Sequence, residues 1–334
     1  MESTTLGRGG PLVSRVGLGL MGMSGIYGPA DDAESTATIR AAIDAGITLL
    51  DTGDFYGMGH NEMLLASALR EVPRDSVFIQ VKFGAQRDPA GGWVGYDASP
   101  AAVKTSLAYS LRRLGTEYVD LYQPARLDPD VPIEDTVGAI AEMIEAGYVR
   151  YAGLSEMGAD TIRRAHAVHP IAALQIEYSL MSRGIEGSLL PFVREAGIAV
   201  TAYGVLSRGL LSPATARLAG PADPRGRFPR FQAQNLAHNL DLVTTLEQIA
   251  AQRGATAAQL AIAWVLSRGT DIIPLIGTKR PGRLAEALGA LELKLTAEEL
   301  AAIEAAVPAS AVAGDRYDPH GMTTLDSERP APAG

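Results

Sequence analysis

Three ionisable residues, Asp51, Tyr56 and Lys82, have the types and spacing expected of a proton-transfer site. Asp51 ends the apolar run 47–50, Tyr56 follows on a glycine-flanked loop, and Lys82 ends the mostly apolar run 77–81. A buried lysine is costly unless a carboxylate lies beside it, so we expect Lys82 to pair with Asp51. A tyrosine hydroxyl has a pKa of about 10, and a neighbouring ammonium should lower that pKa. The alternative is purely structural, with Asp51 capping a turn and Lys82 in a salt bridge.

These residues need a scaffold that gathers the ends of several strands at one edge. Turn signals in residues 6–20 predict a small hairpin that leads into the first strand. Apolar runs predict strands at 14–20, 47–51, 76–82, 119–123, 149–154, 173–177, 198–203 and 271–276. Helical periodicity predicts helices at 33–45, 61–70, 100–114, 133–146, 159–168, 187–195, 239–252, 256–267 and 284–291. Eight strands with a helix after most of them predict a closed (β/α)8 TIM barrel, with two extra helices before the last strand.

The alternative α/β architecture, a doubly wound open sheet, would need a phosphate-binding loop. The segment 17–22 (GLGLMG) matches the pattern GxGxxG, but a loop follows it where the dinucleotide fingerprint requires a helix. The barrel is therefore favoured. No internal linker divides residues 1–334, so we expect one domain, with 308–334 as a loosely ordered C-terminal tail.

The composition limits the classes of partner. The chain has 334 residues, of which 47% are hydrophobic and 20% charged, and a net charge of −9. This acidity argues against nucleic acid or an anionic membrane as the main partner. The absence of cysteine excludes thiolate chemistry, and no His/Asp/Glu spacing suggests a metal site. With neither an apolar signal region nor a membrane span in the sequence, we expect a cytoplasmic protein.

The predicted strand ends place further polar residues at the mouth of the barrel. They are Asp51, Lys82, Gln123, Ser155, Gln175, Glu177, Tyr203 and the segment 277–279 (GTK). The segment after the last strand also clusters Lys279, Arg280 and Arg283 at a helix start. Such a cluster on an acidic protein predicts a phosphate site.

In these segments the chain resembles the aldo-keto reductase superfamily over essentially its whole length. The resemblance rests on 17–22 (GLGLMG), 50–57 (LDTGDFYG), 61–62 (NE), Lys82, 120–123 (DLYQ), 153–155 (GLS) and 202–204 (AYG). It implies a barrel enzyme that uses NADPH, or less often NADH, to reduce aldehydes and ketones. It also implies that Tyr56 donates the proton, supported by Lys82 and Asp51.

The resemblance further implies a cofactor groove. Tyr203 would stack on the nicotinamide, while Ser155 and Gln175 would bond its carboxamide. Lys279 and Arg283 would hold a 2′-phosphate, which favours NADP(H) over NAD(H). The expected cofactor residues are Gly22, Met23, Asp51, Ser155, Gln175, Tyr203, Gly204, Leu206, Ser207, Arg208, Gly209, Leu210, Ile276, Gly277, Thr278, Lys279, Arg283, Glu286 and Ala287.

Three positions depart from the family pattern. Glu156 and Ala287 stand where the family usually has asparagines, and Ala125 stands where it usually has a histidine that orients the substrate carbonyl. Because alanine cannot donate a hydrogen bond, Tyr56 must act alone or with Arg126 or a water, or the activity is weak. A loss of this kind could cost on the order of 3 kcal/mol in the transition state.

The candidate substrate residues are Trp93, on a glycine-rich loop, together with Ala125 and Arg126. We expect NADPH-dependent reduction of a small aldehyde or ketone. A cofactor-binding sensor or scaffold subunit is the alternative that Ala125 favours. A barrel isomerase or aldolase with Lys82 as a Schiff base is a third, and it would leave the predicted phosphate site without a role.

Overall fold

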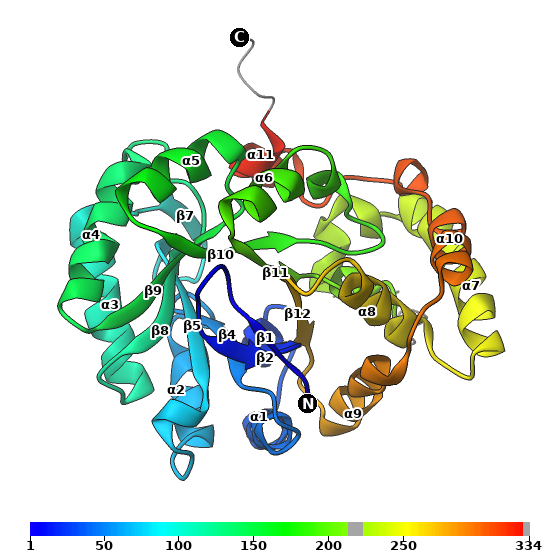
Figure 1. Ribbon diagram of the computed structural model, residues 1–334, viewed down its shortest axis with the longest axis horizontal. Coiled ribbons are helices and arrows are strands. Elements are labelled where there is room, and N and C mark those ends of the chain that lie inside the picture. The colour runs from blue at the N-terminus through cyan, green and yellow to red at the C-terminus, as the bar shows by residue number, and fades with distance from the viewer. Residues whose placement is uncertain (213–222, 330–334) are drawn as a thin grey trace.

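Eight parallel strands close into a barrel, and they follow one another around it in chain order (Figure 1). The computed structural model describes residues 1–212 and 223–329. β12 pairs with β3, so the barrel has no free edge. The (β/α)8 prediction is confirmed. The strands are β3 (Gly17–Gly19), β4 (Leu49–Gly53), β5 (Phe78–Phe83), β8 (Val119–Pro124), β9 (Val149–Ser155), β10 (Ile171–Glu177), β11 (Ala199–Tyr203) and β12 (Ile272–Gly277).

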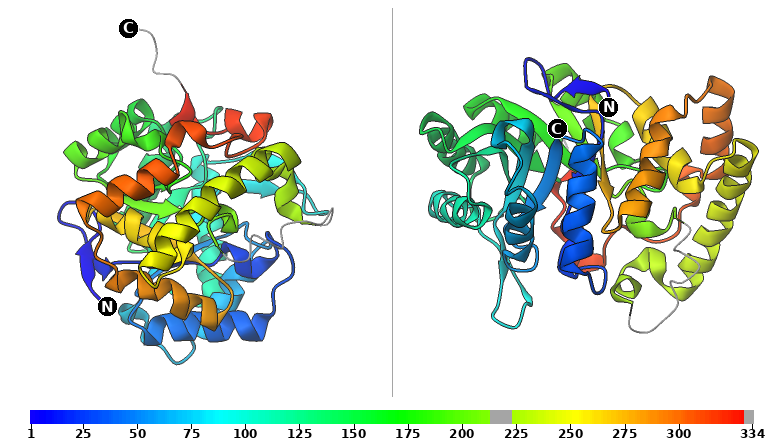
Figure 2. Two further views of the ribbon diagram at one scale, coloured as in Figure 1. Left: turned by 90° about the vertical axis from the view of Figure 1, so that its right-hand side faces the viewer. Right: turned by 90° about the horizontal axis from the view of Figure 1, so that it is seen from below.

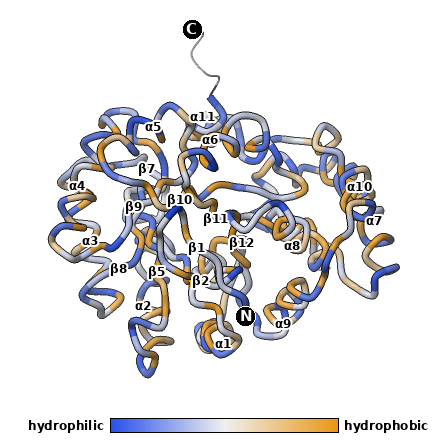
Figure 3. The backbone as a smooth tube through the Cα atoms, in the orientation of Figure 1, coloured by the Kyte–Doolittle hydropathy of each residue, from blue (hydrophilic) through white to orange (hydrophobic). Residues whose placement is uncertain are grey.

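Amphipathic helices form the outer ring, in which α1 to α6 and α7 to α9 pack in chain order and α9 contacts α1. Figure 3 shows hydrophobic and hydrophilic residues alternating along these helices. The two helices predicted before the last strand are present as α7 and α8. The ring consists of α1 (Asp32–Asp44), α2 (His60–Ala68), α3 (Pro100–Leu114), α4 (Ile133–Glu145), α5 (Ala159–Val168), α6 (Leu189–Ala196), α7 (Ala233–Gln252), α8 (Ala257–Ser267) and α9 (Pro281–Leu288).

Some helix boundaries differ from the prediction. α7 begins six residues before the predicted position 239, in what was expected to be a polar insert. α9 begins at Pro281 rather than at 284, because the fixed φ of proline suits the first helical position. A helix that was not predicted, α10 (Ala297–Ala306), follows and packs on α7. Its capping box, formed by Thr296 and Glu299, is a signal that the sequence carries.

An N-terminal hairpin covers the amino end of the barrel. It consists of β1 (Ser3–Thr5) and β2 (Leu12–Ser14), and the Arg8 amide donates to the Gly197 carbonyl before β11 at 2.7 Å. Leu6 and Val13 extend from it into a buried cluster with residues of the strands. With this end of the barrel covered, the carboxyl end is where a ligand is expected to bind. Figure 2 shows the blue hairpin and the red C-terminal segment around α11 (Pro319–Thr323) at opposite ends.

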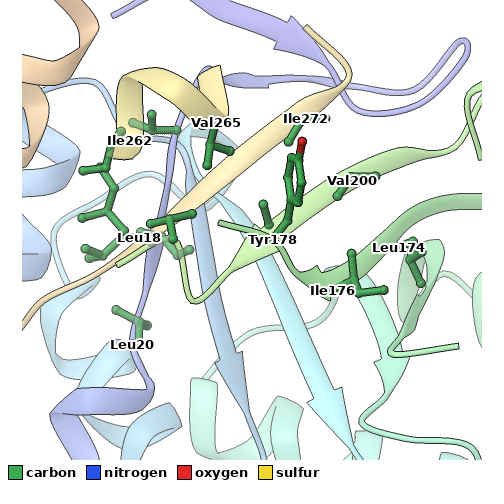
Figure 4. Close-up of a cluster of buried hydrophobic side chains, with 14 of the residues drawn as sticks. Leu18, Leu20, Leu174, Ile176, Tyr178, Val200, Ile262, Val265 and Ile272 are labelled. Carbon is green, nitrogen blue, oxygen red and sulfur yellow. The ribbon is translucent and has the colours of Figure 1, made fainter. Parts of the chain in front are cut away.

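A larger apolar core fills the space between the barrel and the helices. Figure 4 shows part of it, where Ile262 and Val265 of α8 face Leu18, Val200 and Ile272 of the strands. These side chains are nearly inaccessible to solvent. Close packing on this face fixes the strands whose ends carry the polar residues.

The carboxyl end is covered by two segments that were not predicted to be ordered. The first is a hairpin of β6 (Ala85–Arg87) and β7 (Trp93–Tyr96). The second is the segment 308–329, which contains α11 and donates to the barrel through Ser327, whose amide bonds the Glu156 carbonyl at 3.2 Å. The expectation of a loosely ordered tail therefore does not hold for 308–329. Residues 330–334 lie outside the described residues, as does part of the predicted insert 206–235.

Candidate active site

Asp51 and Lys82 form the expected ion pair at the carboxyl end of the barrel. They lie on the adjacent strands β4 and β5, and Lys82 Nζ is 2.5 Å from Asp51 Oδ1. Both side chains are buried. The same carboxylate oxygen accepts hydrogen bonds from Gln80 Nε2 at 3.1 Å and Gln175 Nε2 at 2.9 Å. Three donors thus hold Asp51 in one orientation.

Tyr56 lies directly beyond this pair, and the ammonium of Lys82 is 5.2 Å from the centre of its ring. Phe55 packs edge-on against the same ring, with centroids 4.8 Å apart. Burial raises the pKa of Tyr56 well above its usual value, and the charge of Asp51 adds to this effect. The prediction that Lys82 lowers this pKa is therefore wrong as a net effect. The physical reason is that desolvation of the phenolate dominates and the negative charge of Asp51 opposes its formation as well.

Lys82 itself experiences opposing effects. Burial lowers the pKa of its ammonium, whereas Asp51 raises it, and the net direction is downward. Arg126 also lowers this pKa, which indicates that its positive charge lies near the pair. The site therefore places an acid, Tyr56, among three charged groups.

The two residues expected to bond a carboxamide, Ser155 and Gln175, lie at adjacent register positions on β9 and β10. Gln175 donates to Asp51 and its oxygen accepts from Gln123 Nε2 at 3.2 Å. Both are buried. Their contact with a nicotinamide stays a prediction.

Glu156, the residue after Ser155, has a partner that the sequence did not reveal. Its carboxylate receives two hydrogen bonds from Arg316 of the C-terminal segment, each 2.9 Å long. Ser327 Oγ and Tyr203 Oη donate to it as well, both at 2.7 Å. Burial alone would raise the pKa of the Glu156 carboxyl, but Arg316 outweighs burial and lowers that pKa to about 2.

This carboxylate is therefore a permanent anchor for the segment 308–329. Glu156 also has a left-handed backbone, with φ of 53°, which is uncommon for a residue with a side chain. An asparagine at this position could not form the bidentate pair with arginine.

Glu177, at the end of β10, is a second anchor. Arg208, Arg230 and Arg316 lie within 3.4 to 3.5 Å of its carboxylate, and Ser182 donates to it at 2.7 Å. Arg208 reaches this position through three successive left-handed residues, Ser207, Arg208 and Gly209, with φ of 47°, 55° and 93°. The turn directs Arg208 inward, where its guanidinium pairs with Glu177, and its expected contact with the cofactor stays a prediction.

Tyr317 is a residue at the mouth that the sequence analysis missed. Its hydroxyl lies 3.1 Å from that of Tyr203 and accepts from Arg126 Nη2 at 3.2 Å. Arg208 lies over its ring at 4.6 Å from the centroid. The only sequence signal was a charged and aromatic stretch, DRYD, within a tail rich in small residues and proline.

The predicted substrate residues lie on the same side of the mouth. Ala125 is buried, and its amide donates to the Phe83 carbonyl at 2.8 Å. Arg126 follows it and donates to the Ala125 carbonyl at 2.6 Å. Trp93 is about half exposed, stacks beneath Arg87 at 3.7 Å and contacts Phe55 at 5.8 Å between centroids. Phe55 thus contacts both Trp93 and Tyr56 and links the two side chains.

The basic segment after β12 lies across the barrel from these residues. Lys279 donates to the carbonyls of Gly28 and Pro29, on the loop before α1. Arg283 pairs with Glu286 at 2.6 Å, while the second oxygen of Glu286 is buried and has no partner among the described residues.

The other expected cofactor residues are distributed around this segment. Ala287 is buried in the core and offers no polar group. Met23 is also buried, and a side chain at Gly22 would contact Tyr27. Of the remaining positions, Gly204, Leu206 and Leu210 follow β11, Ile276 and Gly277 end β12, and Thr278 follows β12.

Residues 1–212 and 223–329 contain no group of His, Asp or Glu side chains that could hold a metal ion. No helix in these ranges is long and apolar enough to cross a membrane.

The closed barrel and the Asp51–Lys82 pair beside Tyr56 define a class, and comparison with known proteins identifies it. Residues 15–308 match the model of the aldo/keto reductase family, and the chain belongs to that family of nicotinamide-dependent oxidoreductases. A similar curated protein is a probable aldo-keto reductase of Glycine max, 42% identical over 320 residues that cover 95% of this chain and 92% of the relative.

Two solved structures are also similar. A glycerol dehydrogenase from Gluconobacter oxydans has a TM-score of 0.80 and 29% identity, over 97% of this chain and 96% of that one. A thermostable aldo-keto reductase in complex with the inhibitor epalrestat has a TM-score of 0.73 and 30% identity, over 92% of this chain and the whole of that one.

Proposed function

We propose that this protein reduces an aldehyde or ketone to an alcohol with NADPH, using Tyr56 as the proton donor. The observation that carries the proposal is the buried Asp51–Lys82 pair, at 2.5 Å, directly beside Tyr56. When bound, the reduced nicotinamide supplies the hydride that the carbonyl carbon accepts. The carbonyl oxygen then takes its proton from Tyr56, so that hydride and proton together give the alcohol.

The hydroxyl of Tyr56 is protonated at neutral pH and is therefore available as a proton donor. Burial and the charge of Asp51 raise its pKa, so loss of the proton needs a cation that stabilises the phenolate. The ammonium of Lys82 stabilises the phenolate that forms when the proton leaves, and Asp51 holds that ammonium in place. Gln80 and Gln175 fix Asp51 in turn. These residues are thus placed to stabilise the negative charge that develops on Tyr56 in the transition state.

The residues around β12 fit a dinucleotide with a phosphate on its ribose. The buried, unpartnered oxygen of Glu286 can accept a hydrogen bond from an exocyclic amino group such as that of adenine. Lys279 and Arg283 supply two positive charges beside it. Among the described residues, the hydrogen bonds of Lys279 go to the backbone carbonyls of Gly28 and Pro29, so an anionic ligand would give its ammonium a charged partner. These features support NADPH over NADH.

A second candidate function is that of a cofactor-binding sensor or scaffold subunit. The observation that favours it is Ala125, which is buried and places a methyl group where a hydrogen-bond donor would orient the carbonyl. This candidate predicts tight cofactor binding with little or no reduction of any carbonyl.

Fluorescence titration with NADPH and with NADH, followed by a panel of aldehydes, tests the proposal. We expect tighter binding of NADPH and its oxidation in the presence of at least one aldehyde. In Lys279→Met and Arg283→Met, affinity for NADPH should fall about 10- to 100-fold, while affinity for NADH should hardly change. Arg253→Met, at the exposed end of α7, removes the same charge away from the site and should change neither. Binding without oxidation of any aldehyde would support the sensor, and absence of binding would contradict both.

A further inference from the structure

The carboxyl end of the barrel holds a cluster of charged side chains, and one of them lacks an ionic partner. Its carboxylates and most of its bases are joined in ion pairs: Asp51 with Lys82, and Glu156, Glu177 and Glu328 with Arg208, Arg230 and Arg316. Arg126 is the fifth base. In the described part of the chain no carboxylate oxygen lies within 4.0 Å of its guanidinium. This cluster therefore contains one more basic side chain than carboxylates, although the protein as a whole is acidic.

The contacts of Arg126 leave much of its hydrogen-bonding capacity unused. Of five N–H groups, one donates to the Ala125 carbonyl and one to the Tyr317 hydroxyl. Its Nε is buried and has no partner among the described residues. Both direct partners are neutral oxygens. Burial disfavours the charge of this guanidinium, but Tyr317, Tyr203 and Glu156 outweigh burial and raise the pKa of Arg126, so the group stays charged. Such a group gains most from an anionic ligand.

The position of Arg126 indicates which ligand it meets. It follows β8, next to β5 and Lys82, and its charge acts on Tyr56 and Lys82. The basic residues assigned to the cofactor follow β12, which lies opposite β8 in the order of the barrel. Arg126 therefore lies on the side of the proton donor and not on the side of the proposed phosphate site.

We propose that Arg126 binds a carboxylate of the substrate, so that the preferred substrates are oxo acids, whose aldehyde or ketone group lies on the same molecule as a carboxylate. This inference rests on the proposed reductase function. The planar guanidinium presents parallel N–H groups that match the two oxygens of a carboxylate. Anchoring one end of the substrate there orients the carbonyl toward Tyr56, in place of the contact that Ala125 cannot make.

Matched pairs of substrates test this proposal. The probes are 4-oxobutanoate, 4-carboxybenzaldehyde and glyoxylate, each compared with its methyl ester under the same conditions with NADPH. We expect at least one acid to exceed its ester by tenfold or more in kcat/KM. In Arg126→Met the kcat/KM of that acid should fall about 10- to 100-fold, while the ester should change less than threefold.

Two further variants distinguish binding of the carboxylate from a general effect of losing an arginine. Arg126→Lys keeps the charge but loses the fork geometry, so it should recover part of the activity on the acid. Arg150→Met removes a half-exposed arginine at the amino end of β9 and should change neither substrate. Retained turnover of the ester in Arg126→Met shows that the variant is folded.

The outcomes distinguish this inference from the proposed function. If esters and acids are reduced equally well, the carboxylate proposal is overturned and the reductase stands. If Arg126→Met lowers both members of a pair equally, Arg126 acts on the carbonyl itself and the proposal is again overturned. If neither acids nor esters are reduced while NADPH binds, the reductase function fails and this inference fails with it.

Discussion

Two buried pairs of opposite charge stand at the carboxyl end of the barrel, and different parts of the chain build them. Asp51 and Lys82 lie on adjacent barrel strands, 31 residues apart. Glu156 and Arg316 are 160 residues apart and join the end of β9 to the C-terminal segment. The first pair is fixed by the sheet, whereas the second also fixes the segment that carries Tyr317.

The difference between the two pairs indicates a different role for each of them. The pair on the strands sets the charge around Tyr56, and close-packed strands hold it rigidly. The pair on the C-terminal segment holds Tyr317 in contact with Arg126, the residue that we propose binds the substrate. Breaking the first should therefore change the chemical step, and breaking the second should change binding.

Lys82→Met is expected to have the largest effect. It removes the charge that stabilises the Tyr56 phenolate and leaves Asp51 buried without a cation. We expect kcat to fall about 1,000-fold and the free energy of unfolding to fall by about 3–5 kcal/mol. Lys104→Met breaks an exposed pair with Glu142 and should change stability by less than about 1 kcal/mol. A kcat within tenfold of the parent in Lys82→Met would remove Lys82 from the mechanism.

Arg316→Met is the matching test of the second pair. Glu156 and Glu177 would both lose a partner, so we expect a loss of about 3–5 kcal/mol in the free energy of unfolding. Because Tyr317 would lose its support, KM should rise more than kcat falls. Arg164→Met, which removes an exposed bidentate pair with Glu134, is the control. A fall in kcat with unchanged KM in Arg316→Met would contradict the assignment of the second pair to substrate binding.

The pH dependence of the free energy of unfolding tests the contribution of the Glu156–Arg316 pair. The folded pKa of Glu156, about 2, lies below its usual value of 4.5. Its contribution to stability is therefore complete above about 4.5 and is lost as the pH falls toward 2, with a size on the order of 3 kcal/mol. Denaturant unfolding at several pH values measures this contribution. In Glu156→Gln the free energy of unfolding should depend less on pH below 4.5. If its slope equals that of the parent, other groups cause the pH dependence.

Tyr317→Phe should have the smallest effect. It removes the hydroxyl that accepts from Arg126 and contacts Tyr203, which is worth about 1 kcal/mol. We expect KM for the best substrate to rise severalfold while kcat stays within twofold. Tyr109→Phe, exposed on α3, is the control. A large fall in kcat would mean that Tyr317 belongs to the chemical step.

The sequence predicted the parts of the site that depend on local pattern. Asp51 and Lys82 each follow an apolar run in the sequence and lie in the buried strands β4 and β5, which are parallel neighbours in the barrel and so bring the two side chains together. It did not predict the role of Glu156, because its partner Arg316 lies in a tail whose composition resembles disorder. The hairpin that carries Trp93 was also missed, since its strands are only three and four residues long. The pKa of Tyr56 was predicted in the wrong direction, because burial depends on tertiary packing that no short motif encodes.

The most direct test of the central claim is a single turnover of NADPH in Tyr56→Phe. Protein saturated with NADPH is mixed with the best aldehyde, and oxidation is followed by the loss of nicotinamide fluorescence. We predict that Tyr56→Phe binds NADPH with the affinity of the parent but oxidises it at least 100-fold more slowly, because the proton donor is absent. Oxidation at the rate of the parent would contradict the assignment of Tyr56 and, with it, the role given to Asp51 and Lys82.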